Sequence, residues 1–205
     1  MVTTKQRAAD APIADINRER PFIAEPTKIT PLLRPFNAVV DREMGQRFVP
    51  GRLMAWDLRT AFSWVGGSLY WLLPAGKARK GLGDRIQNMV AIASAYTVNS
   101  PYCIADTAGS EPTGRSEAEL EAIRTGADVS GVSSLSRRER LAIRYARLVS
   151  STPLEFPSDF VAELTAAFSE QEIVILAALA AEINRNARLF EALGVPPLAF
   201  GPETI

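Results

Sequence analysis

Apolar residues recur at helical spacing along most of the chain beyond residue 30. Between residues 84 and 97, the apolar residues Met89, Ile92, Ala93 and Tyr96 follow one another at three- and four-residue steps, which places them on one face of an α-helix. Patterns typical of β-strands are nearly absent. The pattern therefore predicts an all-α fold of about eight helices, with no sheet of three or more strands.

Three Ser-x-x-Glu capping boxes predict where helices begin. They lie at Ser116–Glu119, Ser136–Glu139 and Ser169–Glu172. In a capping box, the serine and the glutamate each accept a hydrogen bond from the other's backbone N–H group. Gly126 and Gly194 follow the first and the last of these helices and predict their ends, because glycine readily adopts the left-handed backbone of a helix C-terminus.

Other helix boundaries are predicted from single polar residues and proline. Thr30 before Pro31 opens a helix toward Met44, since proline fits the first position of a helix. Ser158 or Asp159 caps the helix that follows a proline-bracketed turn.

The segment 52–73 contains all three tryptophans of the chain. The adjacent Gly66 and Gly67 predict that this helix bends or splits. Large aromatic side chains usually serve burial, so these tryptophans are interpreted as core or subunit interface. Alternatively, some of them, Trp64 in particular, line a pocket for an apolar or aromatic ligand.

The chain divides into an arm, one domain and a tail. Residues 1–29 are polar, contain Pro12, Pro21 and Pro26 and show little periodicity, which predicts an extended or partly disordered arm. Residues 30–198 form a single all-α domain, and residues 199–205 a C-terminal tail. A chain of 205 residues is long enough to bury a sizeable core.

Composition narrows the possible partners and location. The formal net charge is zero and no long basic run occurs, which argues against nucleic acid as a partner. The N-terminal residues lack the apolar core of a secretion signal, and the apolar stretches are too short to span a membrane. A single cysteine excludes a disulfide framework and fits a reducing cytoplasm.

Cys103 is the first candidate for chemistry. Ser100 directly precedes Pro101, so Ser100 is expected to cap a new helix, with its hydroxyl reaching the backbone N–H of Tyr102 or Cys103. Cys103 then lies in the first helical turn, where the helix dipole favours a thiolate. Alternatively, Cys103 is a small buried apolar residue, as free cysteines often are.

Three further residues are candidates for catalysis. Asp106 follows Cys103 by three residues and can share its helix face, so it is a candidate general base, or else an exposed carboxylate near the helix start. Tyr96 and Tyr102 can donate hydrogen bonds to a substrate, or simply pack.

The candidate substrate-binding residues carry hydrogen-bonding or aromatic side chains. They are Asn88, Asn99, Ser100, Thr107, Trp64 and Arg185. Asn88 can orient a carbonyl group but cannot carry a proton at neutral pH. Arg185 can bind a carboxylate with two N–H groups, or pair with Glu182 on the same helix. No metal site is expected, because the chain has no histidine and only one cysteine, and no cofactor is expected.

The stretch around Cys103 resembles the alkylhydroperoxidase D-like and carboxymuconolactone decarboxylase superfamily. That pattern is a glutamate twelve residues before a Cys-x-x-Cys pair, with a histidine four residues after the second cysteine. Here the same positions hold Asn88, Ser100, Cys103 and Thr107. The resemblance extends over roughly residues 50 to 197 and implies an alkylhydroperoxidase D-like helical bundle that assembles as a dimer, trimer or hexamer.

The substitutions in this pattern bear on function. In the peroxidase members two cysteines cycle between dithiol and disulfide, while the glutamate and the histidine move protons; this chain retains only Cys103. The first hypothesis is therefore a divergent enzyme that acts on a small, largely apolar molecule by decarboxylase, isomerase or lyase chemistry. The alternatives are a one-cysteine peroxidase that uses Cys103 and a non-catalytic ligand-binding oligomer.

Overall fold

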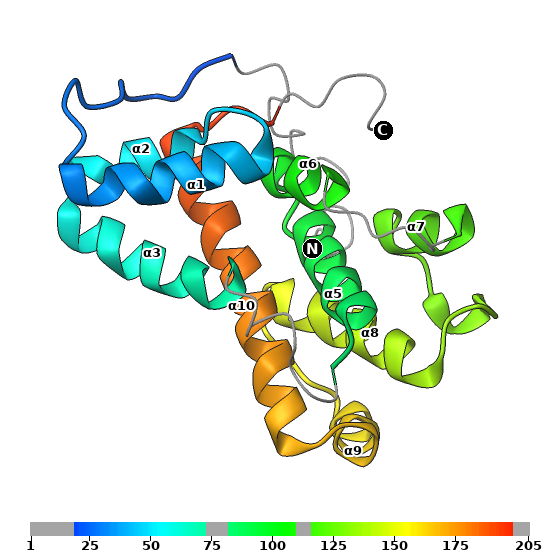
Figure 1. Cartoon of the computed structure of the whole chain (residues 1–205). Helices are drawn as coiled ribbons and strands as arrows, with labels where there is room; N and C mark the ends of the chain where they lie inside the picture. The colour runs from blue at the N-terminus through cyan, green and yellow to red at the C-terminus, as the bar shows by residue number, and fades with distance from the viewer. Residues whose placement is uncertain (1–18, 73–81, 110–115, 199–205) are drawn as a thin grey trace, which may run out of the picture.

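The computed structural model describes residues 19–72, 82–109 and 116–198, and within them every regular element is a helix (Figure 1). The α-helices are α1 (Arg34–Met44), α2 (Val49–Leu53), α3 (Leu58–Leu72), α5 (Asp84–Thr97), α6 (Pro101–Gly109), α7 (Glu117–Arg124), α8 (Arg137–Ser150), α9 (Ser158–Ala167) and α10 (Glu170–Leu193). Three short 3-10 helices are η1 (Pro31–Leu33), η2 (Met54–Trp56) and η3 (Val129–Gly131). The predicted all-α fold is confirmed.

The predicted helix caps are largely confirmed. Both hydrogen bonds of the capping box are present at the starts of α7, α8 and α10. Gly194 ends α10 with a positive φ of 67°. Two other caps differ from the prediction: Thr30 makes no side-chain capping bond, and α9 already includes Ser158 and Asp159, so that Pro157 occupies the cap position.

The segment with the tryptophans divides at Asp57 rather than at the glycine pair. The prediction that Gly66 and Gly67 split a helix is wrong, because α3 runs unbroken from Leu58 to Leu72, and a bend at these glycines stays a prediction. Asp57 has an extended backbone, and its carboxylate accepts a hydrogen bond from the Thr60 N–H at 2.8 Å, which starts α3 afresh. The preceding residues form the separate helices α2 and η2.

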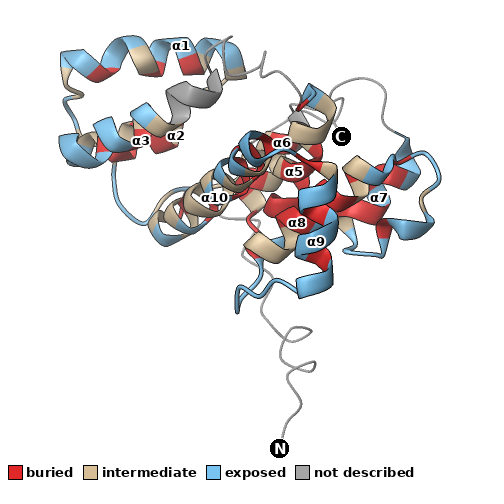
Figure 2. Cartoon of the chain, turned by 90° about the horizontal axis from the view of Figure 1, so that it is seen from below, coloured by how far each residue is buried: buried red, intermediate tan, exposed pale blue. Residues whose placement is uncertain are grey.

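Among the described residues, two clusters of buried apolar side chains make up the core. The first cluster joins α5, α7, α8, α9 and the N-terminal half of α10. The second joins α1, α2, α3 and α6 to the C-terminal half of α10. Helix α10 therefore contributes to both, and it runs between the group α1–α3 and the remaining helices (Figures 1 and 2). Cys103 and Tyr102 belong to the second cluster.

Residues 19–29, the described part of the predicted arm, lie against the domain. The Phe22 N–H donates to the Leu193 carbonyl at 2.9 Å, and the Trp56 indole donates to the Ala24 carbonyl at 2.8 Å. Glu25 pairs with Arg47. The Phe22 ring lies so close to Gly194 that a Cβ there would approach it to 2.6 Å. Residues 1–18 and the predicted tail at 199–205 lie outside the described residues.

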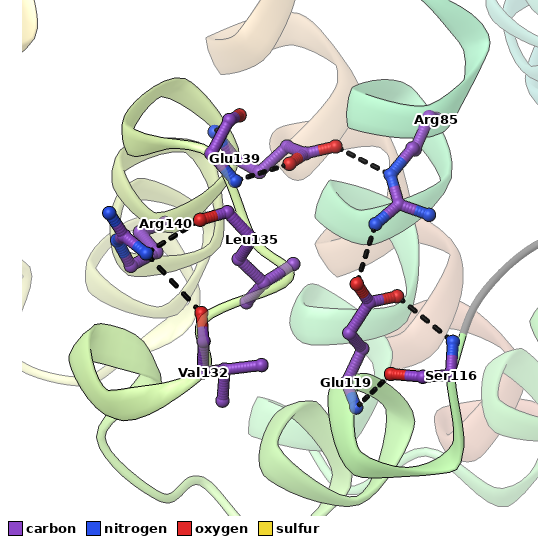
Figure 3. Close-up of polar contacts among 8 residues, drawn as sticks. Arg85, Ser116, Glu119, Val132, Leu135, Glu139 and Arg140 are labelled. Atoms are coloured by element: carbon purple, nitrogen blue, oxygen red, sulfur yellow. Dashed lines mark hydrogen bonds and ion pairs between the residues drawn. The ribbon is translucent and has the colours of Figure 1, made fainter.

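An ion-pair network connects α5 with α7 and α8 (Figure 3). Arg85 donates to Glu119 at 2.8 Å and to Glu139 at 2.5 Å. These glutamates also accept the backbone N–H groups of Ser116 and Ser136, as members of their capping boxes. Because Glu119 is 2% exposed, the network places charge in the protein interior, with Arg85 as its cation.

Within the described part of the chain, no single helix is long and apolar enough to cross a membrane. The helices α9 and α10, taken together, have the length and apolar composition of a membrane span, but the angle between them is 117°.

Candidate functional site

The turn between α5 and α6 directs Cys103 inward. Asn99 adopts a positive φ of 52°, which asparagine tolerates better than most residues. Ser100 follows, fully buried, and its hydroxyl accepts the Cys103 N–H at 3.4 Å. The predicted cap is therefore present, and it fixes the backbone of the first turn of α6.

The Cys103 thiol is buried and protonated. Only 3% of the residue is exposed, in the second cluster with Ala187 and Phe190. Burial raises the pKa of the thiol to about 12; the nearby carboxylates of Asp106 and Glu191 also raise it, and the hydrogen bond with Ser100 opposes them. The helix dipole therefore does not yield the expected thiolate, since the cost of desolvating a thiolate is larger. The packing matches the alternative of a small buried apolar residue.

Tyr102 places a neutral hydroxyl in the interior. Its ring packs edge-to-face on Phe190 at 4.8 Å between ring centroids. Burial, with the charge of Asp106, raises the pKa of Tyr102 far above its ordinary value. The hydroxyl is buried and has no hydrogen-bond partner among the described residues. Such an orphaned group is uncommon in native interiors.

Asp106 is the titratable group of α6 whose pKa lies near neutrality. It is partly buried, one turn after Tyr102 and Cys103, and burial raises the pKa of its carboxyl to about 6. A carboxyl with such a pKa exchanges protons readily at neutral pH, as a general acid or base must. Thr107, one residue further, is buried, and its hydroxyl donates to the Ile104 carbonyl at 3.0 Å.

The candidates on α5 and in the turn that follows it lie in different surroundings. Tyr96 packs against the first cluster, whereas Tyr102 and Cys103 lie in the second. Asn88 is partly buried and Asn99 is exposed. The structure thus brings together Ser100 and the α6 candidates, while Tyr96 lies in the other cluster.

Trp64 and Arg185 belong to a contact between α3 and α10. The Trp64 indole donates to the Asn186 side-chain oxygen at 3.0 Å, and the Asn186 amide donates to Glu182 at 3.3 Å. Arg185 pairs with Glu182 at 2.5 Å, which confirms the alternative of an ion pair on α10. The Arg185 guanidinium also lies against Gly67, where a Cβ would approach it to 3.0 Å. These contacts give both residues a packing role, and substrate binding by them stays a prediction.

A cavity of about 570 Å³ lies beside the turn that precedes α6. Its lining comes from the C-terminal ends of α5 and α8 and from α10, and consists of Thr97, Val98, Ser150, Ser151, Thr152, Ala187, Arg188 and Glu191. Glu191 in this lining acts electrostatically on Cys103 and raises the pKa of the thiol, but no described residue of α6 is itself part of the lining. The sequence analysis described the segment before α9 only as a proline-bracketed turn, although the consecutive hydroxyl groups of Ser150, Ser151 and Thr152 are a signal for a polar cavity lining.

Among the described residues, no group of three or more His, Cys, Asp or Glu side chains is placed to hold a metal ion.

Solved structures similar to this chain are alkylhydroperoxidase-related proteins and a debrominase. An uncharacterized peroxidase-related protein from Ralstonia eutropha, described as an alkylhydroperoxidase AhpD core, is 14% identical with a TM-score of 0.67, over 87% of this chain and 92% of that one. A peroxidase-related protein from Silicibacter is 15% identical with a TM-score of 0.70, over 88% and 93%. The chain has the alkylhydroperoxidase D-like fold. The expected fold is therefore confirmed.

One of the similar solved structures is described as a debrominase and not as a peroxidase-related protein. A cysteine-to-alanine variant of the debrominase Bmp8, in complex with 2,3,4-tribromopyrrole, is 17% identical with a TM-score of 0.71, over 88% of this chain and 95% of that one. No family model matches the chain, and no curated protein does. At these identities the likeness establishes the alkylhydroperoxidase D-like fold, and function has to be argued from the site.

Proposed function

We propose that this protein is a divergent enzyme of the alkylhydroperoxidase D-like and carboxymuconolactone decarboxylase superfamily that acts by proton transfer. Its substrate is a small, largely apolar organic molecule, and the reaction is of the decarboxylase, isomerase or lyase type. The observation that carries the proposal is the group on α6: a carboxyl of Asp106 with a pKa of about 6, beside the neutral hydroxyl of Tyr102 and the neutral thiol of Cys103.

Asp106 and Tyr102 each have a role in such a reaction, whereas Cys103 is not required for it. Asp106 takes a proton from a carbon next to a carbonyl group, or returns it, because its pKa lies close to neutrality. Tyr102 donates its unpaired hydroxyl hydrogen to the oxygen on which negative charge develops. The cavity beside the α5–α6 turn has the volume for a small organic molecule, and Arg188 in its lining can hold a carboxylate.

A peroxidase that relies on Cys103 alone is the second candidate. The alkylhydroperoxidase-related structures with the same fold support it. Burial and the high pKa of the Cys103 thiol oppose it, because the thiolate is the nucleophile in peroxide reduction. A ligand-binding oligomer without catalysis is the third candidate.

One set of assays separates the three candidates. In the first assay the substrates are carboxymuconolactone and related small lactones, and NMR in deuterated water detects proton exchange or loss of carbon dioxide. In the second assay the substrate is cumene hydroperoxide, with dithiothreitol as the reductant. We expect lactone turnover, with kcat/KM rising with pH through about 6 as the Asp106 base loses its proton. Asp106→Asn should lower the rate by about 100-fold or more, whereas Cys103→Ser should not.

The opposite results identify the other candidates. Rapid peroxide turnover that Cys103→Ser abolishes would establish the one-cysteine peroxidase. Lactone binding without turnover, equal in wild type and Asp106→Asn, would establish the ligand-binding protein.

We also propose that the protein is a homo-oligomer. Most of the large apolar side chains that are exposed in the described residues belong to one part of the chain, residues 22–62; they are Phe22, Ile23, Leu32, Val39, Trp56, Leu58 and Phe62. Leu32 is 69% exposed and Trp56 is 62% exposed. Exposed apolar side chains that form one surface patch mark contact sites, and we infer that these residues form such a patch.

We therefore expect light scattering to give a mass of at least twice the 22.3 kDa of one chain. Trp56→Glu should shift the mass toward that of a single chain, because a charge at an apolar interface loses hydration on assembly. The exposed Val174→Glu on α10, outside this part of the chain, is the control. A wild-type mass of 22.3 kDa over a broad concentration range would contradict the proposal.

A further inference from the structure

Four arginines lie along one face of α8. Arg137, Arg140, Arg144 and Arg147 are separated by steps of three, four and three residues, which is the spacing of one helical stripe. None of them has a carboxylate within 4.0 Å in the described part of the chain, whereas Arg85 pairs with two. The stripe is therefore a concentration of positive charge in a chain whose formal net charge is zero.

These arginines surround a cavity of about 330 Å³ between η3, α8 and α9. The other residues of its lining are Asp128, Val129, Ser130, Leu141 and Glu163. The lining therefore contains four cationic and two anionic side chains. Val129 and Leu141 are buried and provide an apolar floor beneath the charged groups.

Two of the guanidinium groups are held in place by backbone carbonyls. Arg140 donates to the Leu135 carbonyl at 2.6 Å and to the Val132 carbonyl at 3.3 Å (Figure 3). Arg147 donates to the carbonyls of Ala122 and Ala127, both at 2.8 Å. A guanidinium has five N–H donors, so each keeps donors for a further acceptor. Orientation before binding reduces the entropy lost when a ligand arrives.

The other charged side chains of the lining do not donate to backbone carbonyls in the described residues. Arg144 lies over the Phe160 ring at 4.7 Å from its centroid, and Arg137 is exposed. The Asp128 carboxylate accepts hydrogen bonds from the N–H and the hydroxyl of Ser130, at 2.9 and 2.6 Å. The arginine side chains of the lining thus outnumber its carboxylates. The hydrogen bonds from Ser130 also occupy part of the capacity of the Asp128 carboxylate to accept hydrogen bonds.

We propose that this cavity binds a small multivalent oxyanion, such as a phosphate ester, a diphosphate or a polycarboxylate. Guanidinium groups bind phosphate and carboxylate through paired N–H donors, and several around one cavity favour a ligand with more than one negative charge. The cavity has the size for a small metabolite. Asp128 and Glu163 in its lining would repel a long polyanion that passed over them. The site lies on α8, α9 and η3, apart from the α6 group, so it is independent of the proposed reaction.

Calorimetric titration of the full chain with pyrophosphate and with citrate, at constant ionic strength, tests this proposal. We expect saturable binding of at least one of them by the wild type. Replacing both exposed arginines, in the double variant Arg137→Gln with Arg144→Gln, should weaken that binding by about tenfold or more, because charge-assisted hydrogen bonds are lost. Neither side chain bonds to the backbone in the described residues, so the fold should persist. The control, Arg42→Gln, changes an exposed arginine on α1 and should retain wild-type affinity.

The two ligands distinguish the source of the oxyanion. Tighter binding of pyrophosphate assigns the site to phosphoryl groups, and tighter binding of citrate assigns it to carboxylates. The absence of saturable binding of either ligand would overturn the proposal, as would equal affinities of the wild type and the double variant.

Discussion

Arg85→Met is expected to lower the free energy of unfolding at pH 7 by about 3 kcal/mol. The substitution keeps most of the side-chain volume but leaves two buried glutamates, Glu119 and Glu139, without the cation between them. Loss of one partner from a buried ion pair costs 3 to 5 kcal/mol in general, and the lower value applies because Arg85 is 36% exposed. Thermal denaturation should show a decrease in Tm of roughly 10 °C.

The control is Arg124→Met, which removes an ion pair with the exposed Glu117 on α7. It should cost less than about 1 kcal/mol, as surface pairs do. An equal loss of stability in the two variants would contradict an interior role for the Arg85 network.

The pH dependence gives a second check on the same network. Burial alone would raise the pKa values of Glu119 and Glu139, but hydrogen bonds, including those from Arg85, hold both below their ordinary value. A lowered folded-state pKa contributes stability that is present above the ordinary value and is lost as the pH falls through the folded-state pKa. The difference between wild type and Arg85→Met should therefore shrink below about pH 4.5. A difference that stays constant from pH 7 down to pH 3 would contradict this account.

The same glutamates illustrate how far the sequence alone predicts this fold. A capping box is a local motif, so the starts of α7 and α8 could be placed from Ser116–Glu119 and Ser136–Glu139 without a structure. Their shared partner could not, because Arg85 is 34 residues from Glu119 and 54 from Glu139. Nothing local distinguishes a cap glutamate at the surface from one that is 2% exposed.

Gly66 and Gly67 show that low helix propensity alone does not predict where a helix breaks. Glycine disfavours a helix interior by about 1 kcal/mol, which is small compared with the packing of a whole helix. The structure keeps α3 continuous and uses Gly67 for a close approach of the Arg185 guanidinium, a contact between residues far apart in sequence. The actual break at Asp57 follows from a side-chain cap of the kind that sequence reasoning identified elsewhere.

For the candidate site, too, the sequence predicts the local backbone but not the effects of burial. Its frame, Ser100 as the cap and Cys103 in the first turn of α6, follows from local signals. The protonation state of Cys103 does not, because the desolvation that raises its pKa comes from packing in a cluster with distant residues such as Phe190. The raised pKa of Asp106 has the same cause, and for that reason spacing alone could not separate a general base from an exposed carboxylate.

Ser100→Cys is expected to create a disulfide with Cys103 on mild oxidation. Ser100 is the cap of α6, and its side-chain oxygen lies 3.4 Å from the Cys103 backbone nitrogen, so both side chains start from the same helical turn. A thiol at position 100 restores the Cys-x-x-Cys spacing, in which two sulfur atoms come within bonding reach. Intact-protein mass spectrometry after diamide treatment should show two thiols in the reduced variant and none in the oxidised one. The control, Ser133→Cys, adds a thiol at an exposed position between η3 and α8, and should give no intramolecular disulfide.

The wild type and the Ser100→Cys variant are both expected to reduce cumene hydroperoxide no faster than the buffer does. A disulfide alone does not complete the cycle, because a thiolate must form first and the buried Cys103 thiol has a pKa of about 12. The residues at the positions of the glutamate and histidine relay are Asn88 and Thr107, which do not titrate near neutral pH. Two thiols that persist under oxidation would show that the turn departs from the Cys-x-x-Cys geometry. Rapid turnover by the variant would show that the second cysteine is the one group the peroxidase cycle lacks here.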